Sequence, residues 1–247
     1  MSMIQHRLNT LSTKADGLTG QLSLLTYLTT DLAELRAEFE AIHDVSFQDG
    51  EAIPPENLER FTAFWGIESN KQPRYLEGDI IVSQLPVRIR LIEVSELMTE
   101  VKSSSSFQLG FCPDSEELYL QIRTDQFEEE LRYIKRVLDW EVSKEANDLV
   151  EEDLSLNGGQ EKLTRQKIML KEPNDQDEKT TIHGIVGGPI LGMTTKDVGE
   201  ILARTHAERL RIVQTPRRLV DPLLGPAITM RIQSPGGIII DVHNPLK

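Results

Sequence analysis

The chain has 247 residues, of which 38% are hydrophobic, and a formal net charge of −13 at pH 7. This length suffices for one large domain or two small ones with a buried core. Because an acidic surface repels phosphate backbones, nucleic acid is disfavoured as the main partner. The single cysteine, Cys112, excludes an intramolecular disulfide framework and favours a reducing intracellular compartment, cytoplasm or nucleus. We expect no membrane span and no secretory signal, because no apolar run is long enough.

The most regular pattern occupies residues 1–45, where apolar residues recur at alternating spacings of three and four. Such a heptad pattern is typical of a long amphipathic helix that packs against a partner helix. A three-residue step between Leu25 and Leu28 interrupts it. The alternative is a helix packed on the chain's own core, but a helix of about eleven turns outruns most single domains. The residues expected at the coiled-coil interface are Leu8, Leu11, Leu18, Leu22, Leu25, Leu28, Leu32, Leu35 and Phe39.

The following segment, residues 46–150, reads as a unit that combines a sheet with helices. Strands are predicted over 79–82 and 87–94, and in the second of these, apolar residues alternate with Arg88 and Arg90. This alternation predicts an antiparallel sheet with one buried face and one solvated face that carries both arginines.

Helices flank these strands on both sides. Pro55 is placed to begin a short helix, since proline fits the first helical turn. A hairpin over 107–111 and 118–124 leads into a helix that is predicted from Asp125 to about residue 149.

Residues 151–181 are rich in acidic and amide side chains and read as a mobile connection. The expected order is therefore a coiled-coil arm (1–45), an α+β unit (46–150), this acidic connection (151–181) and a second α+β unit (182–247). The fold class is α+β, with a long N-terminal helix followed by one or two small antiparallel sheets with packed helices. Whether the two units share one core is left open at this point.

The last unit is predicted to begin with a glycine-rich strand and to continue in a helix that ends at Thr215, before Pro216. A hairpin is predicted over 227–232 and 238–242, around a turn with two glycines.

Several side chains of the last unit are of types that ligate metals. Asp241 and His243 share a face if their segment is a strand, whereas His206 and Glu208 diverge on a helix. Such pairs are common by chance. We therefore predict no metal site, no cofactor and no catalytic residue.

Arginines give the same unit a basic stretch within an acidic protein. Guanidinium groups bind carboxylates and phosphates with paired hydrogen bonds, which makes this stretch a candidate for binding an anion or an acidic peptide. The alternative is that the acidic connection neutralises it. The residues of this candidate site are Arg209, Arg211, Arg217 and Arg218.

A second alternative is a magnesium-dependent nuclease or hydrolase. Asp79 and Glu100 would hold the metal ion while Lys102 orients a water molecule. The spacing is permissive, and the acidity of the chain works against a nucleic-acid substrate.

The heptad pattern, together with the absence of a specific catalytic motif, predicts a non-enzymatic subunit or adaptor of a protein assembly. Its partners would be protein subunits, identical or different, bound through the N-terminal helix.

Overall fold

The computed structural model describes residues 21–43, 45–50, 52–65, 72–82, 85–94, 105–112, 117–124, 126–143, 167–171, 185–221 and 224–246. Its helices are α2 (Leu32–His43), α3 (Pro55–Trp65), α4 (Phe127–Tyr133) and α6 (Val198–Ala207), with a π-helical turn, η1 (Ile134–Leu138), directly after α4. Its strands are β1 (Gln21–Thr29), β2 (Gln48–Asp49), β3 (Tyr75–Val82), β4 (Leu85–Glu93), β5 (Ser105–Cys112), β6 (Glu117–Thr124), β7 (Glu141–Ser143), β8 (Lys167–Lys171), β9 (Ile185–Thr194), β10 (Arg211–Asp221), β11 (Gly225–Gln233) and β12 (Ile239–Pro245).

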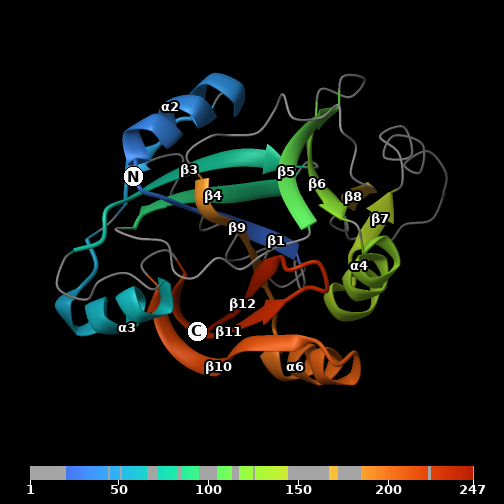
Figure 1. The fold of residues 1–247 in the computed structure, drawn as a ribbon. Helices are drawn as coiled ribbons and strands as arrows, with labels where there is room; N and C mark the ends of the chain where they lie inside the picture. The colour runs from blue at the N-terminus through green and yellow to red at the C-terminus, as the bar shows by residue number, and fades with distance from the viewer. Residues whose placement is uncertain are drawn as a thin grey trace, which may run out of the picture.

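The strands form one mixed sheet of 12 strands in the order β10-β11-β12-β9-β1-β4-β3-β6-β8-β7, with β2 beside β3 and β5 beside β6 (Figure 1). Two stretches of the chain follow the same path within it. In the N-terminal module (β1, α2, β2, β3, β4), the last strand pairs in parallel with the first. The C-terminal module (β9, α6, β10, β11, β12) does the same. Because β1 and β9 pair antiparallel, the two modules face each other like the halves of a twofold repeat.

The turn from the first strand into the helix is built in the same way in both modules. Thr29 accepts a hydrogen bond from the backbone N–H of Asp31, and Thr195 accepts one from that of Asp197. Each aspartate in turn accepts a hydrogen bond from the N–H three residues later, which caps the helix. The two segments read TTDLAEL from Thr29 and TKDVGEI from Thr195. The modules therefore share a short sequence motif as well as a path.

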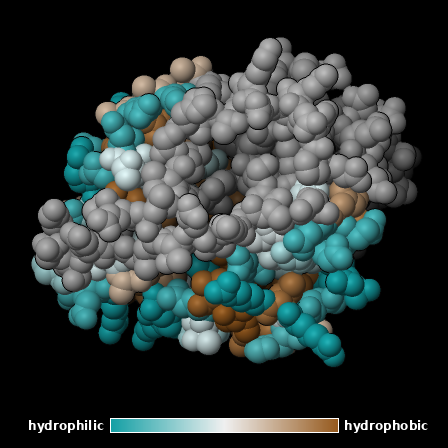
Figure 2. Space-filling model, in the orientation of Figure 1, coloured by the Kyte–Doolittle hydropathy of each residue, from teal (hydrophilic) through white to brown (hydrophobic). Residues whose placement is uncertain are grey.

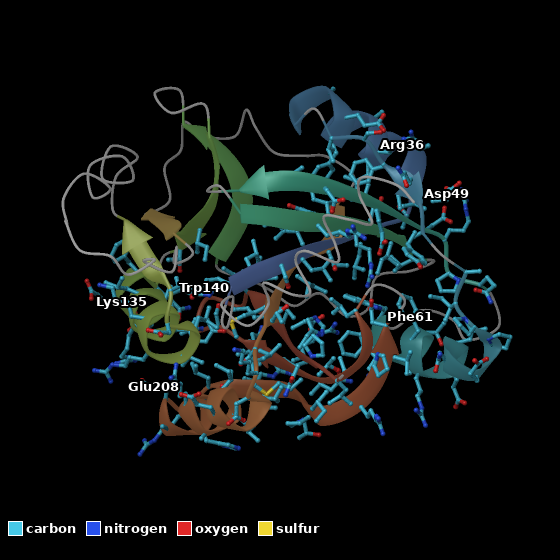
Figure 3. The ribbon with its side chains drawn as sticks, turned by 180° about the vertical axis from the view of Figure 1, so that it is seen from behind. Arg36, Asp49, Phe61, Lys135, Trp140 and Glu208 are labelled. Carbon is cyan, nitrogen blue, oxygen red and sulfur yellow. The ribbon has the colours of Figure 1, made fainter. Side chains whose placement is uncertain are left out.

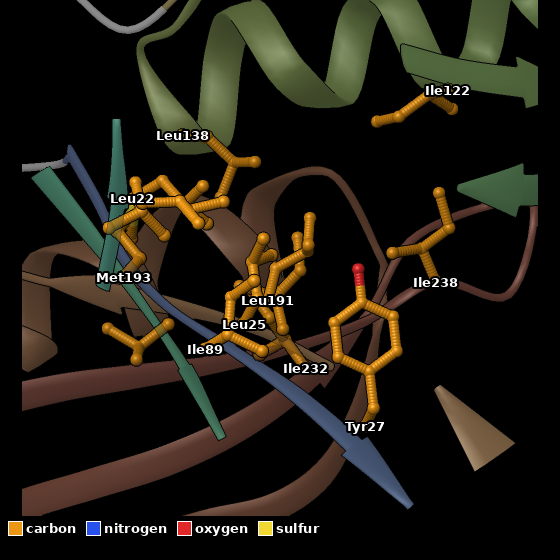
Figure 4. Close-up of a cluster of buried hydrophobic side chains, with 14 of the residues drawn as sticks. Leu22, Leu25, Tyr27, Ile89, Ile122, Leu138, Leu191, Met193, Ile232 and Ile238 are labelled. Carbon is orange, nitrogen blue, oxygen red and sulfur yellow. The ribbon is translucent and has the colours of Figure 1, made fainter. Parts of the chain in front are cut away.

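The main core lies on the face of the sheet that α2 and α6 cover, which we call the outer face. At its centre, Leu25, Ile89, Leu191 and Ile240 occupy neighbouring positions on four adjacent strands, and each is at most 1% exposed. Figure 4 shows part of this cluster. Burying a leucine or isoleucine side chain contributes about 1.5–3 kcal/mol, so this contact between the modules is a main source of stability.

Helix α3 covers the opposite face, which we call the inner face. It is inserted between β2 and β3 and buries Phe61, Phe64 and Trp65 against residues that include Ile190 and Leu219. Figure 3 shows Phe61 at the boundary between α3 and the strands of the C-terminal module. An element inserted into the N-terminal module therefore packs on the C-terminal module.

The segment α4–η1 binds to the C-terminal module at another place. Glu130 of α4 is buried, and its Oε1 accepts hydrogen bonds from the Ser234 hydroxyl at 2.5 Å and the Gly236 N–H at 2.7 Å. Arg136 pairs with Glu208 beyond α6, at 3.1 Å (Figure 3). The Glu130 contacts hold α4 against the turn between β11 and β12, and the Arg136 pair joins η1 to the end of α6.

The prediction of an N-terminal coiled-coil arm is wrong for the residues that the structure describes. Of the predicted interface residues, Leu22, Leu25 and Leu28 lie in β1, Leu32, Leu35 and Phe39 lie in α2, and Leu8, Leu11 and Leu18 lie outside the described residues. All the described ones except Leu28 are buried in the chain's own core. The adaptor function, which depended on a partner helix, is overturned with it.

The predicted fold class is wrong for a second reason. In place of small antiparallel sheets, one mixed sheet runs through both modules. Its parallel pairs include β1 with β4 and β9 with β12, the first and last strands of each module. The helix at Pro55, the strand over 87–94 and the two predicted hairpins are confirmed.

Two predicted helices are too long. The first stops at Leu138, where Asp139 takes a left-handed conformation with φ of 57°, and the chain then forms β7. The second stops at Ala207 instead of Thr215. Arg209, with φ of 58°, reverses the chain, and the following residues form β10.

The visible surface mixes hydrophilic and hydrophobic side chains, and the hydrophobic ones gather over the strands of the C-terminal module (Figure 2). Among the described residues, one large hydrophobic residue is exposed: Val213 of β10, with 43% of its surface accessible to solvent. None of the helices in the described part of the chain has the length and hydrophobicity to span a bilayer.

Candidate ligand-binding site

Curvature of the sheet builds a site on the inner face. In the sheet order, β10 and β4 are five strand steps apart, or about 24 Å in a flat sheet. The Asp221 carboxylate at the end of β10 nevertheless accepts two hydrogen bonds from the Arg90 guanidinium on β4, at 2.8 and 2.9 Å. The inner face is therefore folded over on itself, and this ion pair joins its two sides.

Each module carries an ion pair across its last hairpin, and the two pairs have opposite polarity. In the N-terminal module, Glu77 of β3 lies opposite Arg90 of β4 and accepts a hydrogen bond from its Nε at 2.9 Å. In the C-terminal module, Arg231 of β11 lies opposite Asp241 of β12 and donates to it at 2.6 and 2.9 Å. Equivalent positions of the two modules thus hold complementary charges.

Arg231 also fixes the end of α3. Its Nη1 donates to the backbone carbonyl of Phe64 at 3.2 Å, which satisfies one of the carbonyls left free at a helix C-terminus. Its guanidinium lies 4.4 Å from the ring centre of Phe64 and 5.2 Å from that of Trp65. These contacts combine a hydrogen bond with cation–π attraction and hold α3 over the inner face.

His243 lies close to both ion pairs and has no hydrogen-bond partner. It is on the same side of β12 as Asp241, is 1% exposed, and neither ring nitrogen has a partner in the described part of the chain. Burial lowers the pKa of His243, and the opposing effect of Asp241 and Asp221 does not outweigh it, while Arg90 and Arg231 lower it further. The imidazole is therefore neutral at pH 7.

Three further buried polar groups on this side lack partners. Thr229 lies directly opposite His243, and Thr26 of β1 lies opposite Arg90. Neither hydroxyl, nor the indole Nε1 of Trp65, has a hydrogen-bond partner among the residues described. We call Thr26, Trp65, Thr229 and His243 the inner-face cluster.

The chemistry of this cluster is that of neutral hydrogen bonding. A neutral imidazole offers one donor and one acceptor, a threonine hydroxyl offers both, and an indole offers a donor. In the described segments, no group of three or more histidine, cysteine, aspartate or glutamate side chains is placed to hold a metal ion. The cluster therefore offers donors and acceptors for neutral hydrogen bonds.

The structure places the predicted site residues as follows. Asp241 and His243 share a face of β12, as the strand interpretation predicted. Asp79 is engaged by Arg88, whose Nε donates to it at 2.9 Å. Glu100 and Lys102, the other residues of the nuclease interpretation, lie outside the described residues.

The four predicted anion-binding arginines are spread along the edge of the sheet. Arg211, Arg217 and Arg218 lie on β10, and Arg209 precedes it. Six residues of extended chain separate Arg211 from Arg217, or about 20 Å, and the successive Arg217 and Arg218 point to opposite faces. The described structure does not bring them into one pocket. Anion binding by these residues stays a prediction.

Sequence reasoning missed the ion pairs that frame the cluster. Arg90 was expected on a solvated face, but its side chain is 0% exposed and lies against Asp221 at the end of β10 and the ring of Tyr75 on β3. The sequence did contain a sign of these pairs. The last strand of each module is mostly apolar but carries a charged residue, which is a cation, Arg90, in the first module and an anion, Asp241, in the second.

Comparisons with known proteins give only remote similarity. No protein-family model matches the chain, and no curated protein matches it in sequence. Among solved structures, glyoxalase I from Zea mays is 9% identical over 91% of this chain and 92% of its own, with a TM-score of 0.47. Methylmalonyl-CoA epimerase from Mycobacterium tuberculosis is 12% identical over 93% and 91%, with a TM-score of 0.39. A virulence protein from Salmonella typhimurium is 15% identical over 51% of this chain and 93% of its own, with a TM-score of 0.37.

Proposed function

We propose that this protein binds a small organic molecule at the inner-face cluster, with His243 at the centre of the site. The observation that supports the proposal is a buried, neutral histidine whose two ring nitrogens both lack partners among the residues that the structure describes. The hydroxyl of Thr229, on the opposite residue of the neighbouring strand, lacks one as well.

Buried polar groups without hydrogen-bond partners lower the stability of the folded chain when no ligand is bound. More than nine in ten buried polar groups in proteins are hydrogen-bonded, and each buried group without a partner costs about 1–3 kcal/mol. Here several such groups gather on one side of the sheet, beside ion pairs that are themselves well satisfied. A bound molecule with donors and acceptors would recover part of this free energy.

The surroundings of His243 keep its imidazole in the neutral form. A neutral imidazole is a competent general base. Its protonated form is disfavoured here, because burial, together with Arg90 and Arg231, outweighs Asp241 and Asp221 and lowers the pKa of His243. Binding through hydrogen bonds to the neutral ring is therefore the proposal.

A nuclear magnetic resonance screen of small polar molecules against the ¹⁵N-labelled chain tests the proposal. We expect some of them to shift the imidazole signals of His243 and the amide signals of Thr229 in a saturable way. The shifts should be lost in His243→Asn and in Thr229→Val, because each removes part of the binding set.

The matched control is His206→Gln, which removes an exposed imidazole on α6 and should leave the binding unchanged. If no molecule of the screen perturbs His243, or if the variants bind as the original chain does, the inner-face cluster is a structural feature and the proposal fails. A buried water, which also satisfies such groups, would be the remaining explanation.

A further inference from the structure

Resting on the proposed function, we infer that the inner-face cluster selects an uncharged ligand, an amide, alcohol or carbonyl compound, over an anion or a cation of the same shape. The site has arginines on both sides, and arginines alone would favour an anion.

The arginines are already occupied. All three guanidinium nitrogens of Arg90 lie within 2.9 Å of carboxylate oxygens of Glu77 or Asp221. All three nitrogens of Arg231 are engaged too, two by Asp241 and one by the carbonyl of Phe64. To bind an arginine, an anion would have to displace one of these carboxylates, which belongs to the chain itself and therefore stays close to the arginine.

The carboxylates are occupied in the same way, so a cation gains nothing either. Asp241 is 1% exposed and receives both of its hydrogen bonds from Arg231. Asp221 is 2% exposed and is paired with Arg90. Each of these charged groups is thus paired with an opposite charge before any ligand arrives.

What stays free is neutral. Among the described residues of the inner face, the buried side-chain atoms without a partner are the hydroxyl oxygens of Thr26 and Thr229, the indole nitrogen of Trp65 and the two imidazole nitrogens of His243. Transferring an ion from water to such a site leaves its charge uncompensated, which is far more costly than transferring a neutral polar molecule. The free groups, in contrast, can offer a neutral ligand at least one donor and one acceptor.

Three molecules of nearly the same shape separate the possibilities: acetamide is neutral, acetate is an anion, and acetamidinium is a cation. Each is titrated at constant ionic strength and pH 7 into the ¹⁵N-labelled chain, with the signals of His243 and Thr229 as the readout. We expect acetamide to bind at least about tenfold more tightly than either ion, a conservative figure for the cost of an unpaired buried charge.

Two variants invert the selectivity in opposite directions. Arg231→Gln leaves Asp241 without its cation, so acetamidinium should bind more tightly than acetate. Asp241→Asn frees Arg231, so acetate should bind more tightly than acetamidinium. His206→Gln should bind all three as the original chain does, and the dispersion of the amide signals reports whether each variant is folded.

The outcomes are distinguishable. If an ion binds as tightly as acetamide, the inference on charge fails while the proposed site stands. If none of the three shifts His243 in the original chain, the proposed function and the inference fail together. The titration of the original chain decides between these results even if one of the variants does not fold.

Discussion

Arg90 is the most deeply buried charged residue on the inner face. Burial alone would lower the pKa of its guanidinium, but Asp221 and Glu77 outweigh this effect and raise it. Replacing Arg90 by methionine would keep much of the volume and leave the Asp221 carboxylate buried without its cation. We expect Arg90→Met to lower the free energy of unfolding by about 3–5 kcal/mol, measured by urea denaturation at pH 7.

The matched control is Arg36→Met on α2. Arg36 is paired with Glu40 one turn along the helix, and its side chain is 45% exposed. An exposed pair of this kind contributes about 0.3–0.5 kcal/mol, so this variant should be nearly as stable as the original chain. Equal losses for the two variants would contradict the role assigned to Arg90.

The burial of His243 makes stability depend on pH. Its pKa in the folded chain lies below the ordinary value of 6.5, so the unfolded chain takes up the proton first as the pH falls. The free energy of unfolding should therefore decrease below about pH 6.5 and be fully retained above it. The difference in unfolding free energy between the original chain and His243→Gln, measured from pH 8 to about pH 5, isolates this contribution. A difference that stays constant over this range would contradict the lowered pKa of His243.

At the scale of elements, the capped turn that begins each module's helix gives the next prediction. Asp31 accepts hydrogen bonds from Ala33 and Glu34 at 2.9 and 3.0 Å, and Asp197 accepts one from Glu200 at 3.1 Å. We expect Asp31→Ala and Asp197→Ala each to cost about 1 kcal/mol of stability in urea unfolding, the usual value for losing an N-cap.

Because the two caps lie in different modules, their effects should add, within about 0.5 kcal/mol, in the double variant. Asparagine at either position keeps the acceptor and should restore most of the loss. A helix that needs no cap would show no difference between the alanine and asparagine variants.

The first strand illustrates what the sequence could predict and what it could not. A strand at the centre of a sheet is covered on both faces, so it shows no alternation of apolar and polar residues. In β1, Leu24 and Leu25 are both buried although they point to opposite faces. A short apolar run of this kind has the same pattern as a helix segment. Helix α2 follows directly, so the spacing of apolar residues continued from β1 into α2 and the two were interpreted as one long helix. Strand β4 and the β11–β12 pair were predictable because alternation marks the first and a turn marks the second, although both faces of β4 are buried.

The same limit applies to the candidate site. The alternation in β4 correctly put Arg90 on the face opposite Ile89, but it could not tell that α3 and the end of β10 would cover that face. Such cover comes from segments distant in sequence, here 131 residues apart for Arg90 and Asp221. Asp241 and His243 were recognised as neighbours on one face because that relation is local.

At the scale of the whole molecule, two copies of one path make the site. Neither module has the inner-face cluster alone, since Thr26 and Trp65 come from the N-terminal half and Thr229 and His243 from the C-terminal half. The shared motif after Thr29 and Thr195 was the available evidence of this repeat in the sequence. It is short, and the inserted α3, β5–β8 and α4 segments hide its period.

The packing of α2 on the chain's own sheet leads to a final prediction about the whole chain. Leu35 is 0% exposed within the outer-face core. Truncating a buried leucine to alanine costs about 2–5 kcal/mol, and we expect this loss for Leu35→Ala in urea unfolding. Glu34→Ala, one position away and exposed, should change stability by less than about 0.5 kcal/mol. If the leucines instead served a partner helix, Leu35→Ala would change the molar mass measured by light scattering and leave the unfolding midpoint of the body in place. We expect the reverse, an unchanged mass with a lower midpoint, because the side chain stabilises the fold from within.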